Sequence, residues 1–200
     1  MKNLRISILM TIVTTILLGL IYPLVVTGLA QVLFHHKANG QLIEKNGQLV
    51  GSTIIGQGFS NPGYFHPRPS AAGNGWDASN SGGSNFGPTN QKLIDRVKGD
   101  VSTAQADNPG APVPIDLVTT SASGFDPHIT PASAEFQLVR VAKERGVSVD
   151  QLRALVVKHT EGRQLGFLGE ARVNVLELNL DLDEHFPTHK QAQARSRPLN

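Results

Sequence analysis

The chain has 200 residues, of which 40% are hydrophobic and 17% charged, an ordinary composition for a folded protein that argues against general disorder. Its formal net charge of +2 comes from 18 basic and 16 acidic residues scattered along the chain, so no basic patch indicates nucleic acid as a partner. The absence of cysteine excludes a disulfide framework, a thiolate metal site and a cysteine nucleophile.

The first predicted element is a membrane-spanning helix. No charged residue occurs between Ile6 and Phe34. A helix that rises ~1.5 Å per residue crosses a hydrocarbon layer of about 30 Å well within that length. A cleaved signal peptide has a shorter apolar core and a small-residue cleavage site, and no convincing site precedes His35. We therefore predict that residues 1–36 form an N-terminal tail and an uncleaved transmembrane anchor.

Pro23 lies inside this anchor and predicts a kink, because proline lacks a backbone N–H. A neighbouring membrane helix accommodates a kink better than lipid does, and small residues such as Gly19 either pack against such a helix or are tolerated in a lone anchor. Basic residues flank both ends of the span. The tight cluster of Lys2 and Arg5 favours a cytoplasmic N-terminus and an extracytoplasmic domain from about His35 onward.

Two further elements are predicted from local patterns after the anchor. Asn46-Gly47 lies between two apolar stretches and readily adopts the positive-φ pair of a type I′ turn, which predicts a β-hairpin over residues 40–57. Farther along, apolar residues recur at helical spacing and predict a helix over residues 90–106.

Between these elements lies a segment rich in Gly, Pro, Ser and Asn that also carries many aromatic side chains. Exposed rings are too costly for a simple spacer, and the segment lacks the Lys that a Walker-type phosphate loop needs. Aromatic residues with an Arg are typical anchors of a protein interface, although the same rings could pack the domain's own core. The predicted interface residues are Tyr64, Phe65, His66, Arg68, Trp76 and Phe86.

The second half of the domain predicts a strand followed by a helical hairpin. A β-favouring run over residues 115–119 predicts the strand. Thr130 is a helix cap with Pro131 at the first helical position, and Gly146 can end that helix in a left-handed conformation. Capping-box spacing at Ser148 predicts a second helix. A helix-turn-helix that reads DNA is disfavoured, because acidic Asp150 would then face phosphate.

The end of the domain has an ambiguous pattern. Residues 173–183 alternate apolar and polar residues as in a strand, yet they also present one helical face. Together these elements predict an α+β fold: one N-terminal transmembrane helix, a single compact extracytoplasmic α+β domain over residues 37–183, and a polar C-terminal tail over residues 184–200.

Catalytic chemistry is only weakly indicated. Ser121, Ser123 and His128 are close in sequence, but no Gly-x-Ser-x-Gly elbow surrounds either serine, and such residues more often form turns. His185 and His189 have the spacing of a zinc-binding helix, but an intervening proline breaks that helix, so no metal site is predicted. The alternative function left open is a membrane-tethered extracytoplasmic serine hydrolase.

Long blocks of the chain, in order, resemble one known family. They are "IYPLVVTGLAQVLF", "GSTIIGQGF", "YFHPRPSAAG", "DASNSGGSNFGPTN", "DLVTTSASGFDPHITPASAEFQLVRVAKERG" and "HTEGRQLGFLGEARVNVLELNLDLD". The family is KdpC, the C subunit of the bacterial Kdp potassium-transporting P-type ATPase.

The resemblance implies a non-catalytic accessory subunit of an ATP-driven, high-affinity potassium uptake complex in the inner membrane. Its implied partners are the ATP-hydrolysing B subunit and the potassium-channel-like A subunit. It implies no catalytic residue and no cofactor bound by this chain alone. ATP is implied only through the B subunit, whose affinity for ATP the C subunit raises as a catalytic chaperone. An extracytoplasmic domain cannot touch cytoplasmic ATP, so such an effect would have to pass through the membrane helices as a coupling free energy.

Overall fold

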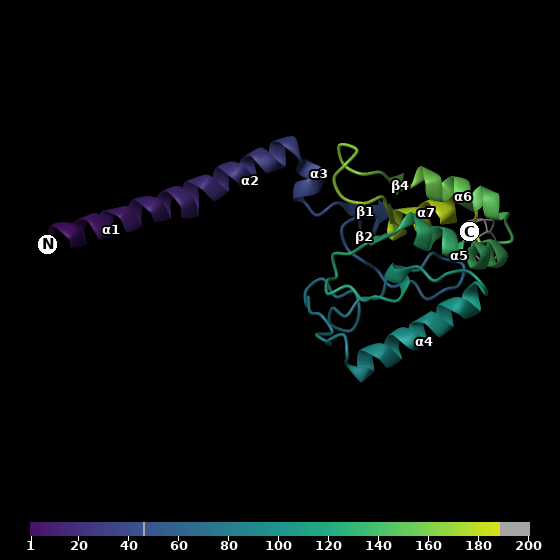
Figure 1. Ribbon diagram of the computed structural model, residues 1–200. Coiled ribbons are helices and arrows are strands. Elements are labelled where there is room, and N and C mark those ends of the chain that lie inside the picture. The colour runs from purple at the N-terminus through teal and green to yellow at the C-terminus, as the bar shows by residue number, and fades with distance from the viewer. Residues whose placement is uncertain (46, 189–200) are drawn as a thin grey trace. The chain divides into compact units, whose positions relative to one another are not determined.

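The chain divides into two units, Met1–Ser52 and Thr53–Asn200 (Figure 1). The structure is a computed structural model that describes residues 1–45 and 47–188. The polar C-terminal tail predicted over residues 184–200 therefore lies mostly outside the described residues.

The first unit begins with a long apolar helix. Its consecutive parts are α1 (Lys2–Thr14), the π-helical η1 (Thr15–Ile21) and α2 (Tyr22–Leu33). In the described part of the chain, Lys2–Leu33 is the one helix long and apolar enough to cross a membrane, and none of its residues is buried. The predicted anchor thus exists as a candidate membrane span.

Pro23 lies in the first turn of α2, directly after the π-helical stretch. There the backbone N–H of Tyr22 bonds to the carbonyl of Leu17, five residues earlier. A proline deprives the preceding turn of one donor, and a wider π-turn is a common way to re-pair the remaining groups. Such turns are a known cause of helix bending, and the kink itself stays a prediction.

A short helix, α3 (His35–Ala38), leads from the span into a hairpin. Strands β1 (Leu42–Lys45) and β2 (Gln48–Ser52) pair antiparallel, with an irregularity between Ile43 and Glu44. Gly47 has φ 74°, as a tight turn requires. The predicted hairpin is confirmed, while Asn46 lies outside the described residues.

The core of the second unit is a helical layer on a small sheet. Helices α5 (Pro131–Arg145), α6 (Val149–Lys158) and α7 (Val175–His185) contribute most of the buried apolar residues. The sheet is antiparallel in the order β3-β5-β4, and its strands are His128–Ile129, Arg172–Asn174 and Thr160–Glu161.

The predicted helical hairpin is confirmed together with its caps. Thr130 Oγ1 accepts the backbone N–H of Ser133 at 3.1 Å at the start of α5. Gly146 ends α5 with φ 67° and ψ 33°, the left-handed conformation that glycine adopts without strain. Ser148 and Gln151 form the capping box that starts α6.

The ambiguous segment at residues 173–183 contains both element types. It begins in β5 and turns at Asn174 into α7, where the Asn174 side chain accepts the N–H of Glu177 at 3.2 Å. Helix is favoured beyond this cap because Leu178 and Leu182, one turn apart, both become fully buried.

The strand predicted at residues 115–119 is wrong. Ile115–Leu117 form a 3₁₀ turn, η2. The Asp116 carboxylate accepts the N–H of Thr130 at 2.9 Å and its hydroxyl at 3.1 Å, and it also bonds to the Ser133 hydroxyl. Asp116 can reach the start of α5 only if the chain turns here, and this buried bonding outweighs the β-propensity of its neighbours.

Helix α4 (Gln91–Asp107) confirms the helix predicted over residues 90–106. Asn90 caps it by accepting the N–H of Lys92 at 2.9 Å. In Figure 1, α4 lies below the α5–α7 layer, and irregular chain fills much of the region between them. That irregular chain includes the aromatic segment.

Candidate functional site

Two buried carboxamides hold the backbone of the aromatic segment. Gln137 of α5 accepts the N–H of His66 at 2.7 Å and donates to its carbonyl at 3.1 Å. Asn179 of α7 does the same for Phe65, at 2.9 Å in both directions. Successive residues of an extended chain point their backbone groups to opposite sides, so the two helices grip neighbouring residues. Side chains here replace the partner strand of a sheet.

Two arginines extend this grip to the preceding residues. Arg145 Nε donates to the carbonyl of Gly63 at 2.7 Å, and its Nη1 pairs with Asp183 at 2.9 Å. The Tyr64 hydroxyl donates to the same carboxylate at 2.8 Å, and its ring lies 4.7 Å beneath the Arg145 guanidinium. Arg140 Nη1 donates to the carbonyl of Tyr64 at 2.9 Å. The buried arginine charge is thus paired and hydrogen-bonded, as burial requires.

Arg68 and Trp76 fix the following part of the segment. The Arg68 guanidinium pairs with Asp126 at 3.1 Å and donates to the carbonyl of Thr119 at 3.3 Å. Trp76 Nε1 donates to the carbonyl of Arg68 at 3.2 Å. The Trp76 ring packs so tightly on Gly58 that a Cβ there would lie 2.8 Å from it.

Glycines bring three distant stretches of backbone together. A Cβ on Gly124 would lie 2.3 Å from the backbone nitrogen of Ala78. A Cβ on Gly56 would lie 2.8 Å from the carbonyl of Asp126, and the Gly56 N–H donates to the carbonyl of Gly124 at 2.8 Å. Only glycine permits such an approach. Residues 56–58, 76–78 and 124–126, which are far apart in the sequence, are therefore packed against one another.

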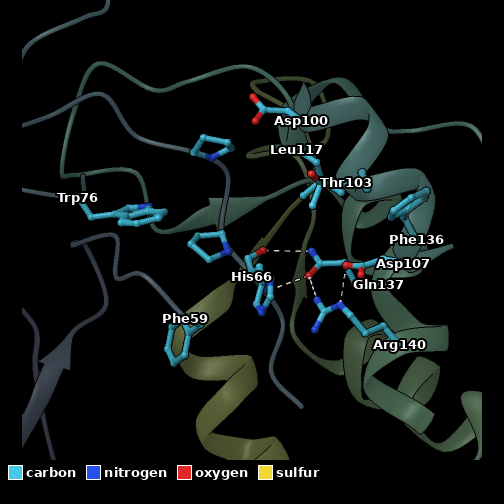
Figure 2. A pocket seen from close by; sticks show the side chains of 13 residues that line it. Phe59, His66, Trp76, Asp100, Thr103, Asp107, Leu117, Phe136, Gln137 and Arg140 are labelled. Carbon is cyan, nitrogen blue, oxygen red and sulfur yellow. Dashed lines mark hydrogen bonds and ion pairs between the residues drawn. The ribbon is translucent and has the colours of Figure 1, made fainter. Parts of the chain in front are cut away.

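A cavity of about 270 Å³ lies between this segment and helices α4 and α5 (Figure 2). In Figure 2, Phe59 and Trp76 lie on one side of it and Phe136 and Asp107 on the other. The remaining residues that line it are His66, Pro67, Pro69, Asp100, Thr103, Ala104, Leu117, Gln137 and Arg140.

Charges at the cavity are mutually compensated. Arg140 Nε lies 3.1 Å from the Asp107 carboxylate and so links α5 to α4. His66 Nε2 lies 3.1 Å from the carbonyl of Asn61. Burial, reinforced by the nearby Arg140 guanidinium, lowers the pKa of His66, so this ring is neutral at pH 7. The cavity therefore offers aromatic surface together with an arginine and an aspartate that pair with each other.

The six predicted interface residues have different surroundings. Phe65 is fully buried, so its ring packs the core, and Tyr64 is partly buried against the same core. His66 and Trp76 line the cavity. Phe86 is 37% exposed. A role of these residues in partner binding stays a prediction.

Sequence reasoning missed the polar side chains that organise the segment. Gln137 and Asn179 are only 4% and 2% exposed. One signal was available: each lies on the apolar face of its helix, Gln137 between Ala134 and Val141, and Asn179 four residues after Val175. A polar residue on a buried face must have a partner, but the pattern does not say which.

The serine hydrolase alternative finds no support in the geometry. Ser121 Oγ donates to the carbonyl of Ser123 at 3.3 Å, and Ser123 Oγ accepts the N–H of Phe125 at 2.9 Å, as in ordinary turns. Among the residues that the structure describes, no hydrogen bond links His128 to either serine. Burial and the nearby Arg172 lower the pKa of His128.

A cluster at the C-terminal end of the domain surrounds Asp181. Its carboxylate contacts Lys158 at 2.8 Å, His159 at 2.6 Å and His185 at 2.8 Å. Burial raises the pKa of Asp181, but hydrogen bonds from Lys158 and His159 outweigh it and lower that pKa to about 2. Over residues 1–45 and 47–188, no group of three or more potential ligands could hold a metal ion. His189 lies outside this range.

Comparisons with known proteins place these features in one family. The family model described as "KdpC: K+-transporting ATPase, c chain" matches residues 4–184. The potassium-transporting ATPase KdpC subunit of Koribacter versatilis is 71% identical over 182 residues, which cover 91% of this chain and 94% of the relative. The subunit of the same name from Rhodospirillum rubrum is 54% identical over 189 residues, covering 94% and 98% of the two chains. That of Acidobacterium capsulatum is 55% identical over 185 residues, covering 92% and 99%.

Proposed function

The chain belongs to the KdpC family of potassium-transporting ATPase subunits, and we propose that it assembles and stabilises an ATP-driven potassium uptake complex without catalysing a reaction itself. The observation that carries this proposal is the family match over residues 4–184, which includes both the candidate membrane span and the folded domain. We therefore assign the membrane span and the folded domain to the same function.

The aromatic segment supports a structural role. Its backbone is held by hydrogen bonds from Gln137, Asn179, Arg140 and Arg145. The guanidinium groups of the two arginines therefore serve to order the segment. A loop ordered by so many side-chain bonds presents a preformed surface, which lowers the entropy cost of binding a partner. We assign the partly exposed Trp76, Arg68 and Phe86 to contacts with the ATP-hydrolysing B subunit or the channel-like A subunit.

The proposed topology has the N-terminus in the cytoplasm and the domain outside the inner membrane. Lys2 and Arg5 precede the span, and cytoplasmic flanks of membrane helices favour such residues. An alkaline phosphatase fused after residue 40 is expected to be active. Inactivity of that fusion, with activity of the phosphatase fused to the N-terminus of the full chain, would reverse the orientation.

A regulatory part of the function follows from this topology. We propose that the chain raises the affinity of the B subunit for ATP. It would do so through contacts of the Lys2–Leu33 helix with neighbouring helices in the membrane. A coupling of this kind is a free energy between two sites and requires no direct contact with ATP. The expected result is a higher KM for ATP in complexes that lack this chain.

The test is reconstitution of the complex with and without the full chain. Tagged chain is expected to co-purify with two larger membrane subunits and to show no ATP hydrolysis alone. Phe86→Ser is expected to reduce the amount of co-purified subunits, whereas Phe125→Ser, at a residue that is 54% exposed, serves as the control for a lost surface ring. Failure of the unmodified chain to retain any ATPase subunit would overturn the proposal.

A further inference from the structure

The loop between β4 and β5 carries three large apolar side chains into solvent. Leu165 is 83% exposed, Phe167 69% and Leu168 47%. Elsewhere in the described part of the second unit, exposed large apolar residues occur singly along the sequence: Phe86, Ile115, Phe125, Val139 and Val157. Single exposed apolar residues are normal, but a cluster at the tip of a protruding loop indicates a binding surface. We call residues 164–168 the apolar tip.

The apolar tip is an ordered turn. Gln164 and Leu168 exchange two backbone hydrogen bonds, each 2.9 Å long. A further bond runs from the Phe167 N–H to the carbonyl of Gln164 at 3.2 Å. Leu165 has φ 53°, a left-handed conformation that branched side chains rarely adopt. The fold thus holds an apolar side chain in an unfavourable conformation and in water, a combination that folding alone does not require.

Paired charges flank the tip on its stem. Arg163 contacts Glu170 at 2.6 Å, and Arg172 contacts Glu161 at 2.8 Å. Each arginine is therefore paired with a carboxylate on the stem, and the tip itself carries no charge. Anionic lipid headgroups and nucleic acid attract unpaired basic residues, and the tip offers none. Its complement is an uncharged apolar pocket on a protein.

We propose that the apolar tip docks into an uncharged, apolar pocket on another subunit of the same ATPase complex. The proposal rests on the accessory function proposed above and names the element that makes one of its contacts. Three side chains form a small contact. A small contact suffices because the membrane helix of the same chain keeps the domain close to its partners and raises the effective concentration.

The first test is a tip variant in the full complex. Leu165→Asn together with Phe167→Ser removes the apolar surface, and asparagine tolerates the left-handed conformation at position 165. The matched control, Ile115→Asn with Val157→Ser, removes apolar side chains that are 74% and 67% exposed elsewhere on the domain. Tagged full-length chains are co-expressed with the other subunits, and the retained subunits are quantified by mass spectrometry.

We expect the tip variant to retain about tenfold less of its partners, the loss typical of a hot-spot side chain, while the control pair stays near the unmodified level. The thermal unfolding midpoint of the isolated full chain is expected to be the same for all three proteins. Retention of partners by the tip variant at the unmodified level would overturn the docking proposal alone. Failure of the unmodified chain to retain partners would overturn the accessory function and this proposal with it.

The second test distinguishes a protein pocket from lipid. It gives a result even if the tip variant does not weaken assembly of the complex. Because the chain has no cysteine, Phe167→Cys gives a single labelling site for a polarity-sensitive dye. The dye is expected to shift to the blue in the full complex and not in vesicles that contain this chain alone. A blue shift in those vesicles would assign the tip to lipid, and no shift in either sample would leave the tip in water. Both results would contradict the proposal.

Discussion

The side chain of Gln137 and the backbone of His66, which are 71 positions apart in the chain, exchange two hydrogen bonds of 2.7 and 3.1 Å. The same carboxamide oxygen also accepts a bond from Arg140 at 2.7 Å, and its nitrogen donates to the carbonyl of Ser133 at 3.2 Å. One buried side chain thus satisfies four groups on two elements. Within the described chain, the backbone of His66 is not paired with a β-strand, so the Gln137 carboxamide takes the place of the strand's backbone groups.

Replacing Gln137 is therefore expected to be costly. Gln137→Leu keeps the approximate shape but leaves the N–H and carbonyl of His66 without these partners, at about 1–3 kcal/mol for each unsatisfied group. We expect the free energy of unfolding to fall by about 2–4 kcal/mol in urea titrations of the full chain in detergent. Gln91→Leu, at an exposed position of α4, is the control and should change the free energy of unfolding by less than about 0.5 kcal/mol. An equal effect of the two changes would contradict the structural role of Gln137.

Gly124 provides a test of the backbone packing. A Cβ at this position would overlap the backbone of Ala78, which has no flexible side chain to move aside. Gly124→Ala is expected to destabilise the domain by about 3 kcal/mol, the upper end of the usual range for overpacked sites, because the overlapping atoms are backbone. Gly99→Ala is the matched control, because nothing lies within 4 Å of a Cβ there and alanine favours its helix. That change should stabilise the domain by up to about 1 kcal/mol, so the two alanines should shift the unfolding midpoint in opposite directions.

These sites show which parts of the fold the sequence could predict. The helical hairpin was predictable because its signals are local: Thr130, Gly146 and Ser148 each act within a few residues. The strand at residues 115–119 was wrong because Asp116 bonds to residues 14 and 17 positions away. Local propensity contains no information on such a partner.

In the candidate site, too, local features were predictable and long-range partners were not. The aromatic residues and Arg68 were identifiable from composition, but most of their partners lie far along the chain. Tyr64, Phe65 and His66 bond to side chains of α5 and α7, and Arg68 pairs with Asp126. Phe65 could be either an interface or a core residue until Asn179 and the core around it were placed. The apolar tip was not predicted, since Leu165 and Phe167 are as easily buried as exposed in a sequence pattern.

Asp181 predicts a pH dependence of stability. Its pKa in the folded chain is about 2, below the usual value of about 3.9 in an unfolded chain. Because the folded-state pKa is lowered, the carboxylate stabilises the fold fully above about pH 4, and this contribution is lost as pH falls toward 2. Asp181→Asn is expected to lower the unfolding midpoint at pH 6 and to flatten its decline between pH 4 and 2. If the unfolding midpoint of Asp181→Asn fell as steeply between pH 4 and 2 as that of the unmodified chain, Asp181 would not be the cause of the decline.

Pro23 links the membrane helix to the proposed regulation. Alanine at this position restores a backbone N–H, which can bond to the carbonyl of Gly19 and extend α-helical pairing into the π-helical stretch Thr15–Ile21. A straighter helix still spans the membrane but presents a different surface to its neighbours. We therefore expect Pro23→Ala to leave membrane insertion unchanged and to raise the KM for ATP of the complex about fivefold, the lower end of typical coupling free energies.

The control for this change is Val25→Ala, which shortens a side chain in the same helix and leaves the backbone pairing intact. A rise in KM with Pro23→Ala and not with Val25→Ala would assign the effect to the backbone at Pro23. Equal KM values for both variants and the unmodified complex would mean that the helix geometry carries no coupling to the nucleotide site. Any influence on ATP affinity would then have to pass through contacts of the domain, which the Phe86→Ser and apolar-tip variants test separately.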